Sequence, residues 1–101
     1  MILYNVTVKI DESIHSSWLK WMKEEHIPEV LETGMFKEAK FWKLLNIDEG
    51  EGLTYAVQYL ADSIEDYQRY VEVFSSDMRK RGMDKWGDRF IAFRTVMELV
   101  Q

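Results

Sequence analysis

Apolar and polar residues alternate along some segments of this chain and follow helical spacing along others. Residues 2–10 and 53–60 alternate with a period of two, which predicts two strands. Two more strands are predicted at residues 36–47 and 89–100, and a polar, glycine-containing run at residues 48–52 predicts a solvated hairpin connection. With one helical segment on each side of the central hairpin, all 101 residues form a single α+β domain of order βαββαβ.

The first helical segment has a buried stripe and an interruption. Its apolar residues at helical spacing are Ile14, Trp18, Trp21 and Met22. Pro28 removes a backbone hydrogen bond to residue 24 and crowds that carbonyl, so we expect the helix to kink or restart near His26–Pro28. Gly34 is the expected residue of left-handed conformation after the helix.

The second helical segment is expected to bury one stripe of side chains, formed by Ile64, Tyr67, Val71, Phe74 and Met78. The basic residues 79–81 then fall in the last turn before Gly82, where positive charge complements the negative end of the helix dipole. An anion site at these residues is the less favoured alternative. A loop is expected through Trp86.

Large apolar groups occur on both faces of the first, third and fourth predicted strands. An antiparallel sheet with one solvated face shows a cleaner alternation. Two helices cover only one face of a four-stranded sheet, so the other face needs a second cover, most simply another copy of the chain. We therefore expect a sheet of strand order 4-1-3-2 and a homodimer.

Composition narrows the possible partners and chemistry. The net charge of −5 argues against nucleic acid or an anionic membrane as the main partner, because phosphate binding requires clustered Lys and Arg. The absence of Cys excludes disulfides, thiol catalysis and thiolate metal sites, and no window reaches the length of a membrane span. A cytoplasmic location is expected. His15 and His26 lack the spacing for a shared metal, and residues 48–52 lack a calcium-loop pattern, so we expect no metal site.

Two residues are the strongest candidates for catalysis. His26 precedes a proline at a predicted helix break, where an imidazole suits general acid–base work; the alternative is that its ring bonds backbone freed by Pro28. Arg94 lies in the middle of a strand, an expensive position for a guanidinium unless an anion meets it. It either anchors a substrate carboxylate or enolate, or forms a structural salt bridge, for example with Glu98 or a helix acid.

Three further polar or aromatic residues have two possible roles each. Asn5 and Gln58 are mid-strand amides that either fix strand register as a pair or bind substrate. The hydroxyl of Tyr55 either reaches a pocket or contributes to a dimer interface. His15 is expected to be solvated.

Several segments together are similar to a known family: Tyr4-Asn5-Val6-Thr7, Trp18 to Met22, His26-Ile-Pro28, Thr54-Tyr55 to Gln58-Tyr59, and Phe90-Ile-Ala92-Phe93-Arg94. They resemble a small bacterial family of unknown function in the ferredoxin-like, dimeric α+β barrel superfamily. This resemblance implies a ferredoxin-like protomer with a four-stranded antiparallel sheet and a homodimer with facing sheets.

The wider superfamily supplies two comparisons of site residues. Its haem-degrading members imply Asn on strand one, Trp on strand three and His on the second helix; Asn5 matches, but the other two are missing. Its cofactor-free monooxygenases hold an aromatic substrate with Asn, Trp, Tyr and Arg, which Asn5, Trp42, Tyr55 and Arg94 supply by type. The family brings no established activity, so an enzyme without a cofactor is a hypothesis that the wider superfamily suggests.

Two functional hypotheses follow. In the first, the protein binds a small apolar or aromatic metabolite between helices and sheet and acts as a monooxygenase- or isomerase-like enzyme. His26 is then the base, while Arg94, Asn5, Tyr55, Gln58 and Trp42 orient or bind the substrate. In the second, the protein is a non-catalytic dimeric interaction or structural module. The first hypothesis requires an open pocket with polar groups inside each protomer.

Overall fold

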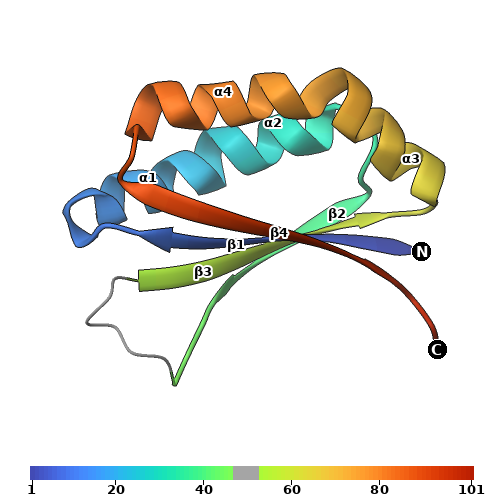
Figure 1. The fold of residues 1–101 in the computed structure, drawn as a ribbon, viewed down its shortest axis with the longest axis horizontal. Coiled ribbons are helices and arrows are strands. Elements are labelled where there is room, and N and C mark those ends of the chain that lie inside the picture. The colour runs from blue at the N-terminus through green and yellow to red at the C-terminus, as the bar shows by residue number, and fades with distance from the viewer. Residues whose placement is uncertain (47–52) are drawn as a thin grey trace.

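A computed structural model describes residues 1–46 and 53–101 and shows one layer of helices on one sheet (Figure 1). The sheet is antiparallel and has the order β2-β3-β1-β4, with strands β1 (Ile2–Ile10), β2 (Glu38–Lys43), β3 (Leu53–Ala61) and β4 (Phe90–Glu98). The predicted βαββαβ order and strand order are confirmed. The predicted hairpin at 48–52 lies outside the described residues.

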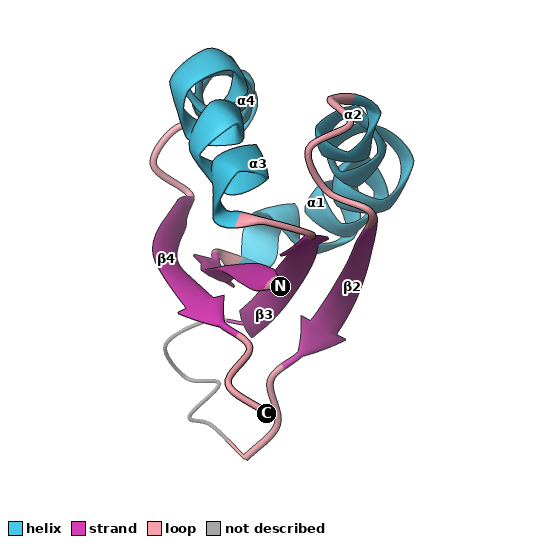
Figure 2. Ribbon diagram, turned by 90° about the vertical axis from the view of Figure 1, so that its right-hand side faces the viewer, coloured by secondary structure: helices cyan, strands magenta, loops and turns pink. Residues whose placement is uncertain are grey.

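Two helical arms cover the sheet. The first arm contains a 3-10 turn and three helical pieces: η1 (Glu12–Ile14), α1 (His15–Trp21), η2 (Met22–His26) and α2 (Ile27–Glu32). The second arm is α3 (Ile64–Arg69), η4 (Tyr70–Phe74) and α4 (Ser75–Trp86). Figure 2 shows both arms on the same side of the sheet, with the opposite face free of helices.

The first arm has the interruption that Pro28 predicts. The segment η2, immediately before the proline, is a π-helical turn, and Pro28 stands in the first turn of α2. A π-turn accommodates the missing proline N–H because it changes the hydrogen-bond spacing locally. The arm ends before Gly34, whose φ of 80° confirms the expected left-handed residue.

The second arm departs from the predicted stripe. A π-helical turn at η4 turns the helix so that Tyr70 is buried while Val71 is 39% exposed and Ile64 is equally exposed. The helix also continues through Gly82 to Trp86 and stops at Gly87, whose φ is 62°. The predicted helix end before Gly82 and the loop through Trp86 were therefore wrong.

The basic residues 79–81 consequently lie within a helix and not at its end. Arg81 forms ion pairs with Glu29 of the first arm and Asp77 of its own helix, and Lys80 pairs with Asp84. These contacts replace the predicted interaction with the helix dipole for two of the three side chains.

The two faces of the sheet differ in burial. The even-numbered residues of β1 and the odd-numbered residues of β3 face the helices and form the core with Trp18, Met22 and Val30. The other face, here called the open face, carries exposed apolar side chains, including Ile91, Phe93 and Met97 of β4 and Trp42 of β2. Strand β2 ends earlier than predicted, and Leu45 beyond it is 73% exposed.

Candidate functional site

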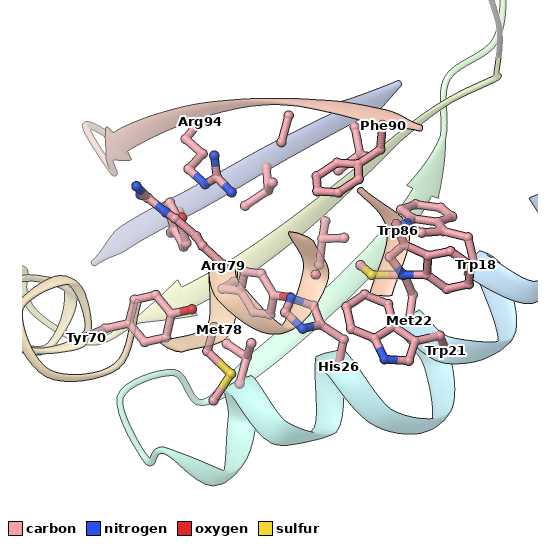
Figure 3. Close-up of a pocket in the computed structure, with 18 residues that line it drawn as sticks. Trp18, Trp21, Met22, His26, Tyr70, Met78, Arg79, Trp86, Phe90 and Arg94 are labelled. Atoms are coloured by element: carbon pink, nitrogen blue, oxygen red, sulfur yellow. The ribbon is translucent and has the colours of Figure 1, made fainter. Parts of the chain in front are cut away.

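A pocket with a volume of about 70 Å³ lies between the two helical arms and strands β3, β1 and β4 (Figure 3). Helix residues and strand residues line it together, and it is partly open to solvent. The lining divides into two parts that Figure 3 shows at opposite ends: a cluster of aromatic rings and a pair of arginines. Polar groups line this pocket, as the enzyme hypothesis requires, but its volume is below the roughly 300 Å³ at which small-molecule sites usually begin.

The tryptophan end of the pocket is formed by Trp18, Trp21 and Trp86 with Phe90 and Met22. The rings of Trp21 and Trp86 meet edge to face, with centroids 5.9 Å apart. The indole nitrogen of Trp86 is buried and has no hydrogen-bond partner among the described residues. This end offers flat apolar surfaces and one unused N–H donor.

His26 lies between the two ends, because the π-turn η2 and Pro28 place it at the edge of the helix that faces the pocket. Its ring stacks on Trp21 with a centroid distance of 4.6 Å, and its Nδ1 is buried without a hydrogen-bond partner in the described residues. Burial lowers its pKa from 6.5 to about 4; Arg81 and Arg94 add to this shift, while Glu29 opposes it. The imidazole is therefore neutral at pH 7 and keeps a lone pair for a proton.

The arginine end of the pocket is formed by Arg79 of α4 and Arg94 of β4, whose side chains extend to the same end in Figure 3. Tyr70 lies on the same side of the pocket, and its hydroxyl group points inward. Burial raises the pKa of Tyr70, an effect that Tyr4 strengthens and the two arginines oppose. Burial likewise raises the pKa of Tyr59, so these phenols remain protonated donors at neutral pH.

Both arginines lack a carboxylate partner in the part of the chain that the structure describes, residues 1–46 and 53–101. The alternative in which Arg94 pairs with Glu98 or a helix acid is therefore not observed within one protomer. Glu98 is four residues further along β4, opposite Ile2, whereas Arg94 is opposite Val6. The guanidiniums remain available to an anion.

The structure brings only two of the predicted site residues into this pocket, His26 and Arg94. Tyr55 faces the helices but lies outside the lining, where its hydroxyl is 2.6 Å from Nε2 of His15. The predicted solvation of His15 was wrong, since its ring is half-buried against Tyr55. This hydrogen bond gives Tyr55 a partner within the fold.

Asn5, Gln58 and Trp42 point to the open face, on the other side of the sheet from the pocket. Asn5 stands directly opposite Gln58, as the register prediction requires, but its amide donates to the hydroxyls of Thr7 and Thr95. Trp42 is 50% exposed. A ligand in the pocket does not reach these three side chains, and their binding role stays a prediction for the open face.

Among the pocket residues that were not predicted as site residues, Gly82 and Trp86 of α4 were missed, and Arg79 was covered only by the less favoured alternative of an anion site. The signal was an apolar spacing of four residues through Met78, Gly82 and Trp86, which continues the helix to Gly87. Glycine was instead interpreted as a helix end. Once the helix continues, Arg79 stands one residue after Met78 and faces the pocket.

No cluster of three or more His, Asp or Glu side chains within the described residues is arranged to hold a metal ion. Among the same residues, no helix combines the length and apolarity that a membrane span needs. The expected absence of a cofactor and the expected cytoplasmic location stay predictions.

The chain matches one family model, described as "Domain of unknown function (DUF4286)", over residues 1–100. None of the curated proteins matches it. The resemblance to a family of unknown function that the sequence suggested is thereby confirmed.

Solved structures similar to this chain share its fold at low identity. A dimeric ferredoxin-like protein from an uncultured marine organism has a TM-score of 0.77 at 8% identity, covering 99% of this chain and 95% of that one. A protein of the ethyl tert-butyl ether d (ethd) family from Bacillus halodurans has a TM-score of 0.70 at 13% identity, with 99% and 100% coverage. A MhuD mutant with two manganese protoporphyrin IX bound per active site has a TM-score of 0.65 at 14% identity, with 100% and 96% coverage. The ferredoxin-like fold is confirmed.

Proposed function

The chain belongs to the DUF4286 family, and we propose that it binds a small aromatic or apolar molecule in the pocket between helices and sheet and transfers a proton there. One observation carries the proposal: a neutral imidazole with a buried, unpartnered nitrogen faces a pocket that has aromatic walls. Buried polar atoms without partners are rare in folded proteins, and a ligand in the pocket would supply this nitrogen with a hydrogen-bond partner.

The chemistry follows from the order of groups along the pocket. His26 accepts a proton from an acidic C–H or O–H of the bound molecule, and the negative charge left on the ligand faces Arg94. The resulting enolate or phenolate is the species that an isomerase reprotonates at another atom. It is also the species that reacts with dioxygen in a cofactor-free monooxygenase. As the proton moves, the charge that develops on the ligand offsets the influence of Arg94 and stabilises the imidazolium that forms on His26.

Hydrogen–deuterium exchange of phenylacetone in D₂O tests the catalytic part of the proposal. This probe has one aromatic ring for the tryptophan end, no charge, and an acidic CH₂ group beside a carbonyl. We expect the wild-type protein to accelerate exchange and His26→Gln to lower the acceleration at least about a hundredfold, the usual contribution of a positioned acid–base group. His15→Gln is the matched control and keeps the wild-type rate, since His15 lies outside the pocket.

Equal exchange rates for the wild-type protein and His26→Gln would refute His26 as the base. If phenylacetone also leaves the NMR signals of the tryptophan indole groups unchanged, the binding proposal fails too. The remaining interpretation is then the non-catalytic dimeric module.

We also propose that the protein is a homodimer that uses its open face. Exposed Phe93 and Ile91 are 62% and 56% accessible and lie on the same side of β4, and Trp42 occupies the far strand of the same face. Exposed apolar patches of this kind mark interaction sites in soluble proteins. Similar solved structures include proteins whose names describe them as dimeric and ferredoxin-like, which supports a second copy as the cover.

Sedimentation velocity tests the assembly. We expect the wild-type protein to sediment as a dimer and Phe93→Lys to shift it towards the monomer, because the substitution places a charge on the apolar open face that the second copy covers. Val73→Lys, at a 56% exposed position on the helical side, is the control that stays dimeric. A monomeric wild-type protein, or a dimeric Phe93→Lys, would contradict the assignment of the open face.

A further inference from the structure

Two arginines from different elements meet at one end of the pocket. Arg79 belongs to α4 and Arg94 to the edge strand β4, and both side chains line the pocket beside Tyr70. Both influence the pKa of Tyr70 in the same direction, lowering it against the effect of burial, which places two positive charges near one phenol. Both side chains are exposed, so water screens their mutual repulsion, and an anion between them would reduce it further.

The described part of the chain supplies no such anion. Arg81, the neighbouring arginine on α4, is compensated by Glu29 and Asp77, whereas no carboxylate lies within ion-pair distance of Arg79 or Arg94 in residues 1–46 and 53–101. Guanidinium groups present planar pairs of N–H donors that match a carboxylate. The phenol of Tyr70, held protonated, offers a further O–H donor at the same end.

The opposite end of the pocket is aromatic, so one ligand can satisfy both ends. We propose that Arg79 and Arg94 clamp an anionic group and that the pocket selects small aromatic carboxylates over neutral aromatic molecules of the same shape. The inference rests on the proposed function, since it assumes that the ring occupies the tryptophan end. It adds Arg79, which the sequence pattern assigned to a helix terminus, as a specificity-determining residue.

A pair of probes with the same shape and different charge tests the clamp. Benzoate and benzamide are titrated separately into the wild-type protein, and their affinities are measured from the shifts of the tryptophan indole N–H signals in ¹H–¹⁵N NMR spectra. We expect benzoate to bind about tenfold or more tightly, the factor that a hydrogen-bonded charge pair contributes. Arg79→Gln and Arg94→Gln each remove most of this preference, because they lower the affinity for benzoate far more than the affinity for benzamide. Arg69→Gln, an exposed arginine outside the pocket, keeps it.

The outcomes separate this inference from the proposed function. Equal affinity of the wild-type protein for benzoate and benzamide overturns the clamp and leaves the aromatic pocket in place. A preference for benzoate that persists in the variant with both substitutions overturns the assignment to Arg79 and Arg94. If neither probe shifts the indole signals, both the clamp and the proposed pocket function are overturned.

Discussion

Replacing His26 by glutamine should change how the stability of the protein depends on pH. In the folded protein the pKa of His26 is lowered from 6.5 to about 4, mainly by burial. Protonation therefore favours the unfolded chain, whose imidazole has an ordinary pKa, and the unfolded chain binds more protons between these two values. The stability that comes with the neutral imidazole is fully present above about pH 6.5 and is lost as the pH falls towards 4.

The magnitude follows from the size of the shift. One unit of pKa corresponds to about 1.4 kcal/mol, so a change from 6.5 to about 4 is worth about 3 kcal/mol of unfolding free energy. This is a large part of the roughly 5–15 kcal/mol by which domains of this kind are stable. The difference in pH dependence between the wild-type protein and His26→Gln comes from residue 26 alone, because every carboxylate of the protein remains in the variant.

Urea denaturation at pH 7 and pH 4, at one fixed protein concentration, measures this difference. Between these two pH values the wild-type protein should lose about 3 kcal/mol more than His26→Gln. His15→Gln keeps His26 and should therefore lose as much as the wild-type protein does. Parallel losses in the wild-type protein and His26→Gln would refute a buried, neutral His26, as would an NMR titration of its ring with a midpoint near 6.5.

Two glycine substitutions test the second helical arm. Gly82→Ala should raise the unfolding free energy by about 0.5–1 kcal/mol in urea denaturation, because alanine favours a helix and its Cβ meets Phe90 and Trp21 at an ordinary 3.8 Å. Since Gly82 lines the pocket, the same substitution should lower the affinity for phenylacetone. A decrease in stability would show that the site has no room for a methyl group. Gly87→Ala should instead lower the unfolding free energy by about 1–3 kcal/mol, because φ is 62° and ψ is −128° there, and an unchanged melting temperature would contradict this.

The fold was predictable because apolar and polar residues alternate along its strands. Strand β1 has the predicted bounds, and β3 differs from its prediction by one residue, since both pair with neighbours on each side and must follow a strict period of two. The edge strand β2 was predicted too long. At an edge, an apolar residue such as Leu45 can remain exposed, so apolarity alone does not extend the strand.

The second helical arm was less predictable because two local features change its register. Because of the π-turn at Tyr70–Phe74, Tyr70 is buried in the core where Val71 was predicted to be. No residue type in that segment indicates an interruption of the helix, whereas Pro28 does so in the first arm. Gly82 lies inside α4, where a Cβ would be in ordinary contact, at 3.8 Å, with Phe90 and Trp21. That contact joins residues far apart in the sequence, so spacing within the helix cannot show it.

For half of the predicted site residues, the sequence could not show whether the side chain lies on the face covered by helices or on the open face of the sheet. His26 was placed by the helix break at Pro28, and Arg94 by its unusual position in a strand. Asn5 and Gln58 have equally polar side chains in the middle of strands, but their positions in the alternation assign them to the open face. The choice between pocket and interface for a strand residue requires the register of the whole sheet.

A crystal structure of the protein with phenylacetone bound tests the central claim, that the pocket between helices and sheet is the ligand site. We expect the ring to lie against Trp21 and Trp86, with the carbonyl or CH₂ group beside His26. We also expect two copies of the chain joined through their open faces. A ligand seated on the open face beside Asn5 and Gln58, or a pocket that stays empty at saturating phenylacetone, would contradict the central claim.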